Sequence, residues 1–437
     1  MTQEFEKVLA ANRGEIAVRI FRACYDLGIS TLAMYSNEDT NSLFRIKADE
    51  AYLIGENQSP LGAYLDIPGI IDLAKKRGAS AIHPGYGFLS ENADFARACE
   101  DAGIKFIGPP SSVLAQMGDK LAAKATAIAC GVPIIPGSTV PLESAEQAVE
   151  IANDYGYPII LKAAAGGGGR GMRRCDTDED VRREFEMVKN EARKAFGNED
   201  IFIEKFLVEP KHIEVQILAD EHGNIMHLGE RDCSLQRRYQ KVVEYAPAWS
   251  VNPDTVAAIR ADAVKIARQV NYVNAGTVEF LVDSKTGKHY FIEMNPRIQV
   301  EHTVTEQVTG IDLVRAQILI AEGHPLSHPM IGLASQDDLR INGYAIQCRV
   351  TTEDPQNNFA PDNGRITSYR SGGGFGVRLD GGNASTGTVI SPYYDSLLVK
   401  VTSWDNTFEG VRRRAIRALS EVHVRGVKTN IPLSRTS

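Results

Sequence analysis

The chain has 437 residues, of which 43% are apolar and 24% charged, a composition typical of a globular protein of about three domains. The formal net charge of −8 argues against a nucleic acid as the main partner, because a polyanion is bound by a basic face. We find no long apolar run and no basic-then-apolar start, so we expect neither a membrane span nor a signal peptide. Six scattered cysteines without a C-x-x-C pair predict no zinc knuckle and no disulfide scaffold; they favour the cytoplasm, with the mitochondrial matrix left open.

The N-terminal quarter of the chain alternates short apolar strands with helices. The expected strands are Lys7–Ala11, Ile29–Tyr35, Ala51–Ile54, Ala81–His83 and Lys105–Ile107. The expected helices are Gly14–Leu27, Ile67–Arg77 and Ser90–Ala102, each followed by a glycine. This alternation predicts an open, doubly wound parallel sheet, whose ligand loops follow the carboxyl ends of the strands. The segment His83–Phe88 follows such an end.

The rest of the chain divides at a proline-containing hinge. We expect one long helix over Ser111–Cys130 and a hinge near Val132–Gly137. A compact lobe follows at about 134–205, with strands Ile159–Lys162 and Ile201–Lys205 around helix Asp178–Phe196. Strands around one helix are then expected up to Val300, and a strand-rich region from about Leu339. The helices expected in these two regions are Pro253–Val270 and Phe408–Val422.

A glycine-rich loop follows the apolar strand that ends in Lys162. Gly166–Gly169 and Gly171 allow backbone N–H groups to converge on an anion, and Lys162 would add a positive charge. The loop contains G-x-G-x-x-G, but no helix opens directly after it, so it fails as a dinucleotide fingerprint. It also lacks the Gly-Lys-Ser/Thr of a Walker loop. A flexible hairpin loop and a phosphate-binding loop both remain open on these residues alone.

A predicted hairpin carries a second cluster. Strand residues two apart share a face, so Glu293 and Asn295 point together, and Glu279 on the partner strand can face them. Two carboxylates and an amide oxygen suit Mg²⁺ or Mn²⁺ bound to nucleotide phosphates. The alternative is that these are solvent-facing positions of an ordinary hairpin. The flanking apolar residues favour a buried hairpin, in which carboxylates need partners.

Two charged segments accompany the hairpin. Arg297 and Glu301 follow it at once, which puts a planar cation and a base beside the metal face. The run Glu230–Lys241 is dense in charge, and by default such a run forms a solvated surface. Cys233 within it is more typical of packing than of a nucleophile. His83 and His212 are, by residue type alone, more often structural than catalytic.

Together these blocks resemble the biotin carboxylase component of biotin-dependent carboxylases, an ATP-grasp family, over nearly the whole chain. The resemblance is carried by Ala11–Glu15, His83–Asn92, Met117–Lys120, the glycine loop, Glu230–Pro247 and Phe291–Glu301. Asp380–Asn383 and Ser391–Ser396 look most like the N-terminal part of pyruvate carboxylase. The family implies an α/β fold with a doubly wound N-terminal domain at 1–115 and an ATP-grasp domain at 116–335 whose mobile lid lobe is about 134–205. It also implies a C-terminal mixed, β-rich domain at 336–437.

The resemblance implies a ligase that works in two stages. ATP phosphorylates bicarbonate to carboxyphosphate, and the carboxyl group then passes to N1′ of biotin on a carrier. The implied cofactors are ATP, Mg²⁺ or Mn²⁺, and carrier-bound biotin. The implied partners are biotin carboxyl carrier and carboxyltransferase domains or subunits and a second copy of the chain, in a homodimer or a larger assembly. Whether pyruvate or an acyl-CoA is the final acceptor stays open.

The resemblance also assigns residues. Those implied for ATP are Lys120, Lys162, Gly168, Gly169, Glu204, Lys205, Phe206, Leu207, His212, Gln236, Tyr239, Glu279, Leu281 and Glu293. Those implied for two metal ions are Glu279, Glu293 and Asn295. Those implied for bicarbonate are Lys241, Arg297, Gln299 and Val300, and those for biotin are Tyr86 and Arg349. Lys241, Arg297, Glu301 and Arg349 would be catalytic: Glu301 as the base, Arg297 stabilising carboxyphosphate and Arg349 stabilising the ureido oxyanion.

Two departures from the family stand out. Tyr239 stands where stand-alone bacterial subunits usually have histidine, and we expect ATP binding to survive this change. Leu433–Ser437 does not follow the family. A truncation, a frame change or an artificial end would each produce such a departure. This end keeps open the alternative of an inactive or assembly-only fragment. Another ATP-grasp ligase, of the carbamoyl-phosphate or purine carboxylase type, is the other alternative.

Overall fold

The N-terminal strands form the predicted parallel sheet. The structure is a computed structural model and describes residues 4–138, 140–163, 172–196, 199–238, 240–382 and 384–434. The strands are β1 (Lys7–Ala10), β2 (Ser30–Tyr35), β3 (Glu50–Leu53), β4 (Ala81–His83) and β5 (Lys105–Phe106), all parallel in the order β3-β2-β1-β4-β5. The helices are α1 (Gly14–Asp26), α2 (Pro60–Ala63), α3 (Ile67–Arg77) and α4 (Ala93–Asp101), with 3-10 turns η1 (Asn37–Asp39) and η2 (Leu43–Lys47).

Alternate residues of β1 show why this sheet is doubly wound. Val8 and Ala10 belong to an apolar core that α1 completes, whereas Leu9 and Ala11 belong to a second core with α3 and α4. The strand order reverses between β1 and β4, and the loops after these two strands therefore lie together. Asn12 joins them, because its side-chain N–H₂ donates to the carbonyls of Pro84 and Tyr86, both at 2.8 Å.

The long helix expected over 111–130 is wrong as a single element. The structure has two helices, α5 (Ser111–Gly118) and α6 (Lys120–Ala129). Asp119 separates them with extended backbone, and its carboxylate accepts hydrogen bonds from the N–H groups of Leu121 and Ala122. A carboxylate that satisfies the first N–H groups of a helix stabilises a new helix start there.

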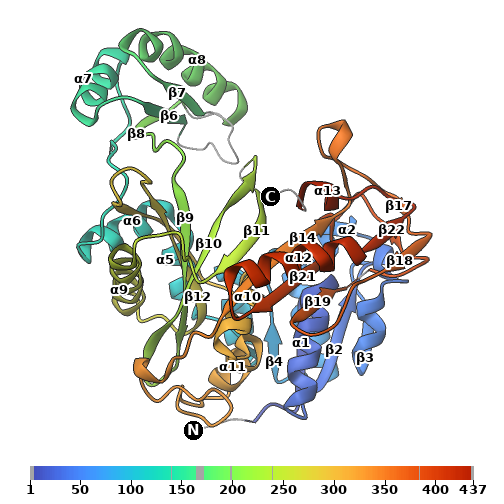
Figure 1. Ribbon diagram of the computed structural model, residues 1–437. Helices are drawn as coiled ribbons and strands as arrows, with labels where there is room; N and C mark the ends of the chain where they lie inside the picture. The colour runs from blue at the N-terminus through green and yellow to red at the C-terminus, as the bar shows by residue number, and fades with distance from the viewer. Residues whose placement is uncertain are drawn as a thin grey trace.

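The lobe after the hinge has its own sheet and core. Its elements are α7 (Ala145–Tyr155), β6 (Ile159–Ala163), β7 (Met172–Cys175), α8 (Asp178–Phe196) and β8 (Ile201–Lys205), with strand order β7-β6-β8. The sequence analysis did not identify α7. Every residue of the lobe's apolar core comes from between Leu142 and Ile203. Figure 1 shows the lobe in green, standing away from the rest of the chain.

One eight-stranded antiparallel sheet forms the centre of the molecule. Its strands are β9 (Lys211–Ala219), β10 (Ile225–Arg237), β11 (Gln240–Ala246), β12 (Asn274–Val282), β13 (His289–Asn295), β14 (Tyr344–Thr351), β19 (Val377–Gly381) and β21 (Leu397–Asp405). Their order is β13-β12-β9-β10-β11-β14-β21-β19, so the sheet continues from the expected ATP-grasp domain into the expected C-terminal domain. The helices of this region are α9 (Pro253–Gln269), α10 (His302–Thr309) and α11 (Leu313–Ala321). The domain boundaries at residues 115 and 335 stay a prediction.

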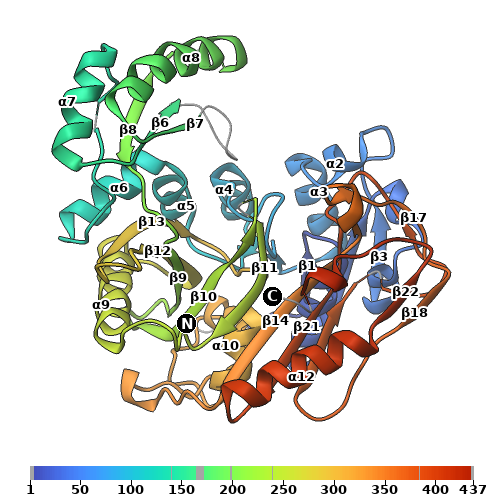
Figure 2. The ribbon, with the colours of Figure 1, turned by 45° about the horizontal axis from the view of Figure 1, so that its top comes forward.

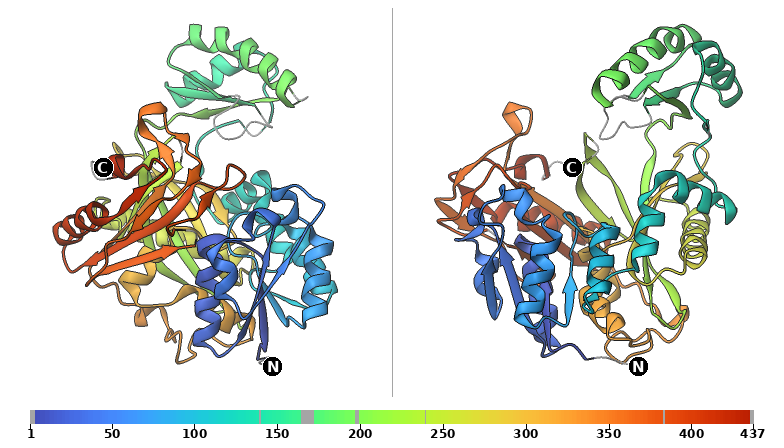
Figure 3. Two further views of the ribbon diagram at one scale, coloured as in Figure 1. Left: turned by 90° about the vertical axis from the view of Figure 1, so that its right-hand side faces the viewer. Right: turned by 180° about the vertical axis from the view of Figure 1, so that it is seen from behind.

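Short elements complete the C-terminal part. They are η3 (Gln336–Asp338), β15 (Glu353–Asp354), η4 (Pro355–Asn357), β16 (Ala360–Pro361), β17 (Gly364–Arg365), β18 (Ser368–Arg370), β20 (Val389–Ile390), α12 (Phe408–Glu421), β22 (His423–Arg425) and α13 (Ile431–Ser434). Figures 2 and 3 show this part, in orange and red, beside the blue N-terminal domain. All six cysteines are free thiols, as expected. Among the described residues, no helix is long and apolar enough to cross a membrane.

The C-terminal part meets the N-terminal domain at a glycine. A Cβ added to Gly382 would lie 2.1 Å from the carbonyl carbon of Gly14, at the start of α1. Backbone cannot approach a side chain so closely, so only glycine fits at this contact. We expect Gly382→Ala to lower Tm by about 1–3 °C, since overpacking costs about 1–3 kcal/mol and the unfolding entropy of a chain of this length is large. The matched control is Gly373→Ala, where the added Cβ meets nothing within 4 Å. Equal Tm values for the two variants, measured by calorimetry, would contradict the close contact.

Candidate active site

A cavity of about 1330 Å³ lies between the lobe, the large sheet and the N-terminal domain. Most residues that the sequence analysis singled out lie in its wall. These are Tyr86, Lys162, Glu204, Lys205, Phe206, Leu207, His212, Gln236, Lys241, Glu279, Leu281, Glu293, Asn295, Arg297, Gln299, Val300, Glu301 and Arg349. Lys120 is exposed and does not line the cavity. Its positive charge nevertheless acts on Glu293, where it opposes the rise in pKa that burial causes. Gly168, Gly169 and Tyr239 lie outside the described residues.

The hairpin of β12 and β13 brings its polar side chains together as expected. Glu279 and Glu293 are register partners, and the side-chain N–H₂ of Asn295 donates to Glu279 at 2.8 Å. Glu279 is only 4% exposed, so the solvent-facing alternative is wrong. Burial raises the pKa of Glu293, and the neighbouring Glu279 raises it further. Among the described residues, the carboxylate of Glu293 has neither a hydrogen-bond nor an ion-pair partner in direct contact, and a cation bound here would supply a direct countercharge.

Lys241 lies at the centre of the site. Its ammonium contacts Glu214 at 2.5 Å, Glu301 at 2.7 Å and Glu279 at 3.0 Å. Burial lowers the pKa of Lys241, but Glu214 and Glu301 outweigh it and hold this pKa well above its ordinary value. Burial raises the pKa of Glu301, but Lys241 and Arg349 hold it well below its ordinary value. Glu301 is therefore ionised at neutral pH.

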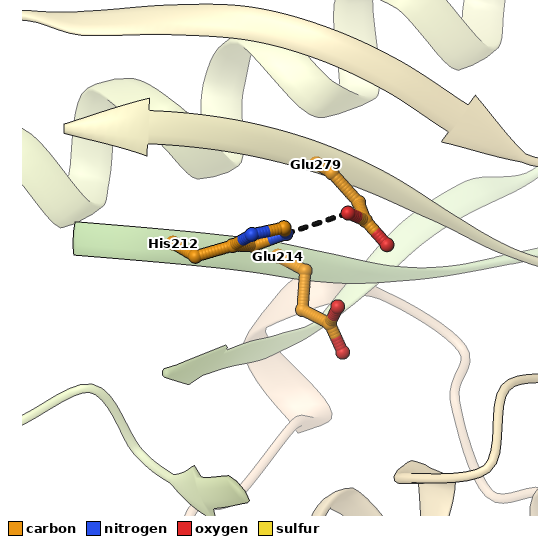
Figure 4. A group of neighbouring side chains, drawn as sticks. All are labelled: His212, Glu214 and Glu279. Atoms are coloured by element: carbon orange, nitrogen blue, oxygen red, sulfur yellow. Dashed lines mark hydrogen bonds and ion pairs between the residues drawn. The ribbon is translucent and has the colours of Figure 1, made fainter. Parts of the chain in front are cut away.

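Figure 4 shows a neighbouring group of side chains, His212, Glu214 and Glu279, that is close enough to hold a metal ion. His212 and Glu214 are two residues apart on β9, and both face Glu279 on β12. The imidazole of His212 lies 2.5 Å from Glu279. The ammonium of Lys241 already contacts both carboxylates, so this group has its cation. The partnerless Glu293 fits a metal better.

The turn after β13 offers backbone donors to an anion. The side chain of Gln299 is held within the protein: it accepts from Arg231 at 2.9 Å and donates to Glu279 at 2.7 Å. Within the described chain, the backbone N–H groups of Gln299 and Val300 donate no hydrogen bond. They precede α10, and free N–H groups before a helix attract anions. Gln299 would therefore bind bicarbonate through its backbone.

The expectation that the run Glu230–Lys241 is a solvated surface is wrong for Glu230–Cys233, which is buried, whereas Leu235, Arg238 and Gln240 are exposed. Arg231 is fully buried, and it donates to Glu214, Gln216, Thr277, Gln299 and Thr305 at 2.5 to 3.1 Å. Cys233 is fully buried as well, and burial raises its thiol pKa, in agreement with the packing interpretation. His83 is fully buried and accepts a hydrogen bond from the N–H of Gly85, as expected of a structural histidine.

Arg349 and Tyr86 form the end of the cavity away from the lobe. Arg349 bridges Glu244 at 2.6 Å and Glu301 at 3.0 Å. The hydroxyl of Tyr86 donates to Glu15. Burial raises the pKa of Tyr86 well above its ordinary value, and Glu15 raises it further, so the phenol keeps its proton.

The sequence analysis missed Glu214 and Glu244, which hold Lys241 and Arg349 in place. Both glutamates are fully buried. The available signal was a glutamate inside an apolar strand pattern, two residues after His212 in one case and five residues before Trp249 in the other.

Three family descriptions match the chain in succession. They are the biotin carboxylase N-terminal domain at residues 4–114, the ATP-binding domain of the carbamoyl-phosphate synthase L chain at 119–329, and the biotin carboxylase C-terminal domain at 347–436. Pyruvate carboxylase of Bacillus subtilis is 56% identical over 430 residues, and mitochondrial pyruvate carboxylase of Rattus norvegicus is 58% identical over 427. Each alignment covers 98% of this chain, which spans a little over a third of each relative's length (37% and 36%).

A solved structure supports the same assignment. The biotin carboxylase domain of 2-oxoglutarate carboxylase from Hydrogenobacter thermophilus, crystallised with MgADP, ADP and bicarbonate, is 50% identical and has a TM-score of 0.90. The match covers 99% of this chain and 93% of that one. With the three successive family matches and the fold described above, this likeness over almost the whole of both chains shows that the chain belongs to the biotin carboxylase family.

Proposed function

We propose that this chain carboxylates biotin with bicarbonate, at the expense of ATP, and that it supplies the first half-reaction of a pyruvate carboxylase or a related carboxylase. One observation carries the proposal: within one cavity, the ammonium of Lys241 contacts both Glu279 and Glu301. Glu279 belongs to the proposed metal and phosphate site, and Glu301 is the proposed base of the bicarbonate site. The three relatives reported above supply the reaction class, and the homologous bicarbonate and MgADP complex agrees with both ends of the cavity.

The lobe end of the cavity would hold ATP. Lys162 would meet the phosphates, while Glu204–Leu207 and Leu281 would surround the adenine and His212 and Gln236 the ribose. Lys162 forms an ion pair with Glu204 here, and ATP would draw it away. Lys120, Gly168, Gly169 and Tyr239 stay proposed for this site. Glu279, Glu293 and Asn295 would hold Mg²⁺ or Mn²⁺, which neutralises charge on the transferred phosphoryl group.

The bicarbonate end would lie between Lys241, Arg297 and the N–H groups of Gln299 and Val300. Glu301 would take the proton of bicarbonate, whose oxygen then attacks the γ-phosphorus, with ADP leaving. Arg297 would stabilise the resulting carboxyphosphate. Lys241 and Arg349 hold the pKa of Glu301 low in the substrate-free site, against the effect of burial. When bicarbonate draws Lys241 and biotin draws Arg349, the basicity of Glu301 rises as the substrates arrive.

The biotin end would use Arg349 and Tyr86. The guanidinium of Arg349 would stabilise the ureido oxygen as N1′ loses its proton, and N1′ then takes the carboxyl group while phosphate leaves. The hydroxyl of Tyr86 donates its hydrogen bond to Glu15, so Tyr86 would offer biotin its ring and its phenol oxygen as an acceptor.

The partners are part of the same proposal. The relatives are complete pyruvate carboxylases, so a biotin carrier and a carboxyltransferase would act beside this unit, in a dimer or a larger assembly. A 2-oxo acid is the favoured final acceptor, since the relatives use pyruvate and the solved neighbour is a 2-oxoglutarate carboxylase. The free thiols agree with the cytoplasm or the mitochondrial matrix.

The primary test is steady-state ADP release with MgATP, omitting bicarbonate and then free biotin in turn. We expect release to require bicarbonate and to rise with biotin, because both substrates converge on Glu301. Release that ignores both would refute the proposal. Release with bicarbonate but without any response to biotin would favour another ATP-grasp ligase.

The metal assignment predicts a second outcome. Glu293→Gln keeps the side chain's size and removes its charge, so we expect a loss of roughly 100-fold or more in turnover and a higher Mg²⁺ requirement. ADP release titrated with Mg²⁺ measures both. The control is Asp283→Asn in the turn of the same hairpin, which should behave as the wild type. Normal activity of Glu293→Gln at low Mg²⁺ would remove Glu293 from the metal site.

The assignment of Arg349 to the biotin site predicts a third outcome. Arg349→Lys keeps a positive charge near Glu244 and Glu301 but loses the planar fork. We expect the biotin-stimulated part of ADP release to fall roughly 100-fold, while bicarbonate-dependent release without biotin changes only a few-fold. An equal fall in both rates would place Arg349 in the bicarbonate step instead.

A further inference from the structure

A lysine that the mechanism above does not use lies fully buried in the C-terminal strand β21. Lys400 is 0% exposed, and burying an ammonium is costly unless it is paired and hydrogen-bonded. It has two partners: the carboxylate of Glu15 at 3.0 Å and the backbone carbonyl of Val300 at 3.1 Å. β19, the neighbour of β21 in the sheet, packs against α1, which carries Glu15 (Figure 1).

The contact with Val300 acts on the bicarbonate turn. The carbonyl of Val300 belongs to the peptide unit that joins Val300 to Glu301, so Lys400 holds the backbone of the base itself. This segment is an irregular turn between β13 and α10, and no ladder hydrogen bonds fix it. The anchored peptide therefore restrains the Cα atoms of Val300 and Glu301, and with them the backbone from which the carboxylate of Glu301 extends.

The contact with Glu15 acts on the biotin end. Glu15 is 7% exposed, and its Oε1 atom forms the ion pair with Lys400 and accepts a hydrogen bond from the hydroxyl of Tyr86. Within the described residues its Oε2 atom has no hydrogen-bond partner, so Lys400 and Tyr86 alone hold the carboxylate by its side chain. A single buried ammonium thus connects Val300 to Tyr86 across three parts of the chain.

We propose that Lys400 is a positioning residue for both half-reactions: it fixes the bicarbonate turn through Val300 and the biotin-facing Tyr86 through Glu15. The proposal rests on the proposed function, since it assigns those two substrates to the ends of the cavity. A purely structural ion pair would have the same burial. A positioning role and a purely structural role differ in which Michaelis constants change when the ammonium is removed.

The test is Lys400→Met, which keeps an unbranched side chain only one atom shorter and removes the charge. We expect the KM for bicarbonate and the KM for free biotin each to rise roughly 10- to 100-fold, with the KM for ATP within about twofold of the wild type. The matched control is Arg260→Met, which breaks the partly buried pair with Glu230 away from the cavity. It should lower Tm and leave all three constants unchanged.

If Lys400→Met does not fold, Glu15→Gln tests the positioning role of Lys400. It keeps the contact of Lys400 with Val300 and weakens the hold on Tyr86, so the KM for biotin should rise more than the KM for bicarbonate. Unchanged constants in the folded variants, or equal changes that include ATP, would reduce Lys400 to a structural role. A wild-type enzyme without bicarbonate dependence would instead refute the proposed function, which keeps the two failures distinct.

Discussion

The ammonium of Lys241 is the contact on which the site depends. Glu214, Glu279 and Glu301 come from β9, β12 and the turn before α10, and all three are buried within 3.0 Å of this one cation. Buried carboxylates that lie near one another repel, and the ammonium offsets this repulsion. Buried ion pairs contribute little net stability, because desolvation offsets their attraction. The arrangement is therefore better explained by the proposed function, in which it would hold a metal carboxylate and a base at fixed distances from the same ammonium.

Further cations hold the carboxylates around Lys241 in place. Arg231 reaches five partners on β9, β12, the turn after β13 and α10, and Arg349 joins Glu244 to Glu301. Each carboxylate that touches Lys241 is thus held from a second side by a guanidinium, a histidine or an amide. In the proposed mechanism, substrates would therefore replace contacts of Lys241 and Arg349 and would not need to assemble the site.

Local signals predicted much of the fold. Helices such as Ile67–Arg77 and Asp178–Phe196 agree with the structure because apolar periodicity, caps and following glycines act over a few residues. The hairpin face followed from the two-residue repeat of a strand, which placed Glu293 with Asn295 correctly. The family resemblance supplied the roles, which no local pattern gives.

Long-range contacts explain the failures. Arg231 looked like a surface residue because its neighbours in sequence are charged, whereas its five partners lie up to 74 residues away. Asp119 looked like an ordinary helix residue, yet it ends one helix region and caps the next. The pairing of β11 with β14 joins residues about a hundred positions apart, and no window of sequence contains both strands.

The lobe and the large sheet differ in how they are connected to the rest of the molecule. The lobe buries only its own apolar residues, so it can change its angle at the hinge without exposing a shared core. The large sheet is continuous from the hairpin of Glu279 to the strand of Arg349, so the metal end and the biotin end are parts of one hydrogen-bonded body. Since carboxyphosphate decomposes in water, the reaction needs a closing part and an unmoving part at once. In the proposed mechanism the lobe and the sheet would meet these two needs separately, and the ion pair of Lys124 on α6 with Glu204 on β8 joins the lobe to that helix.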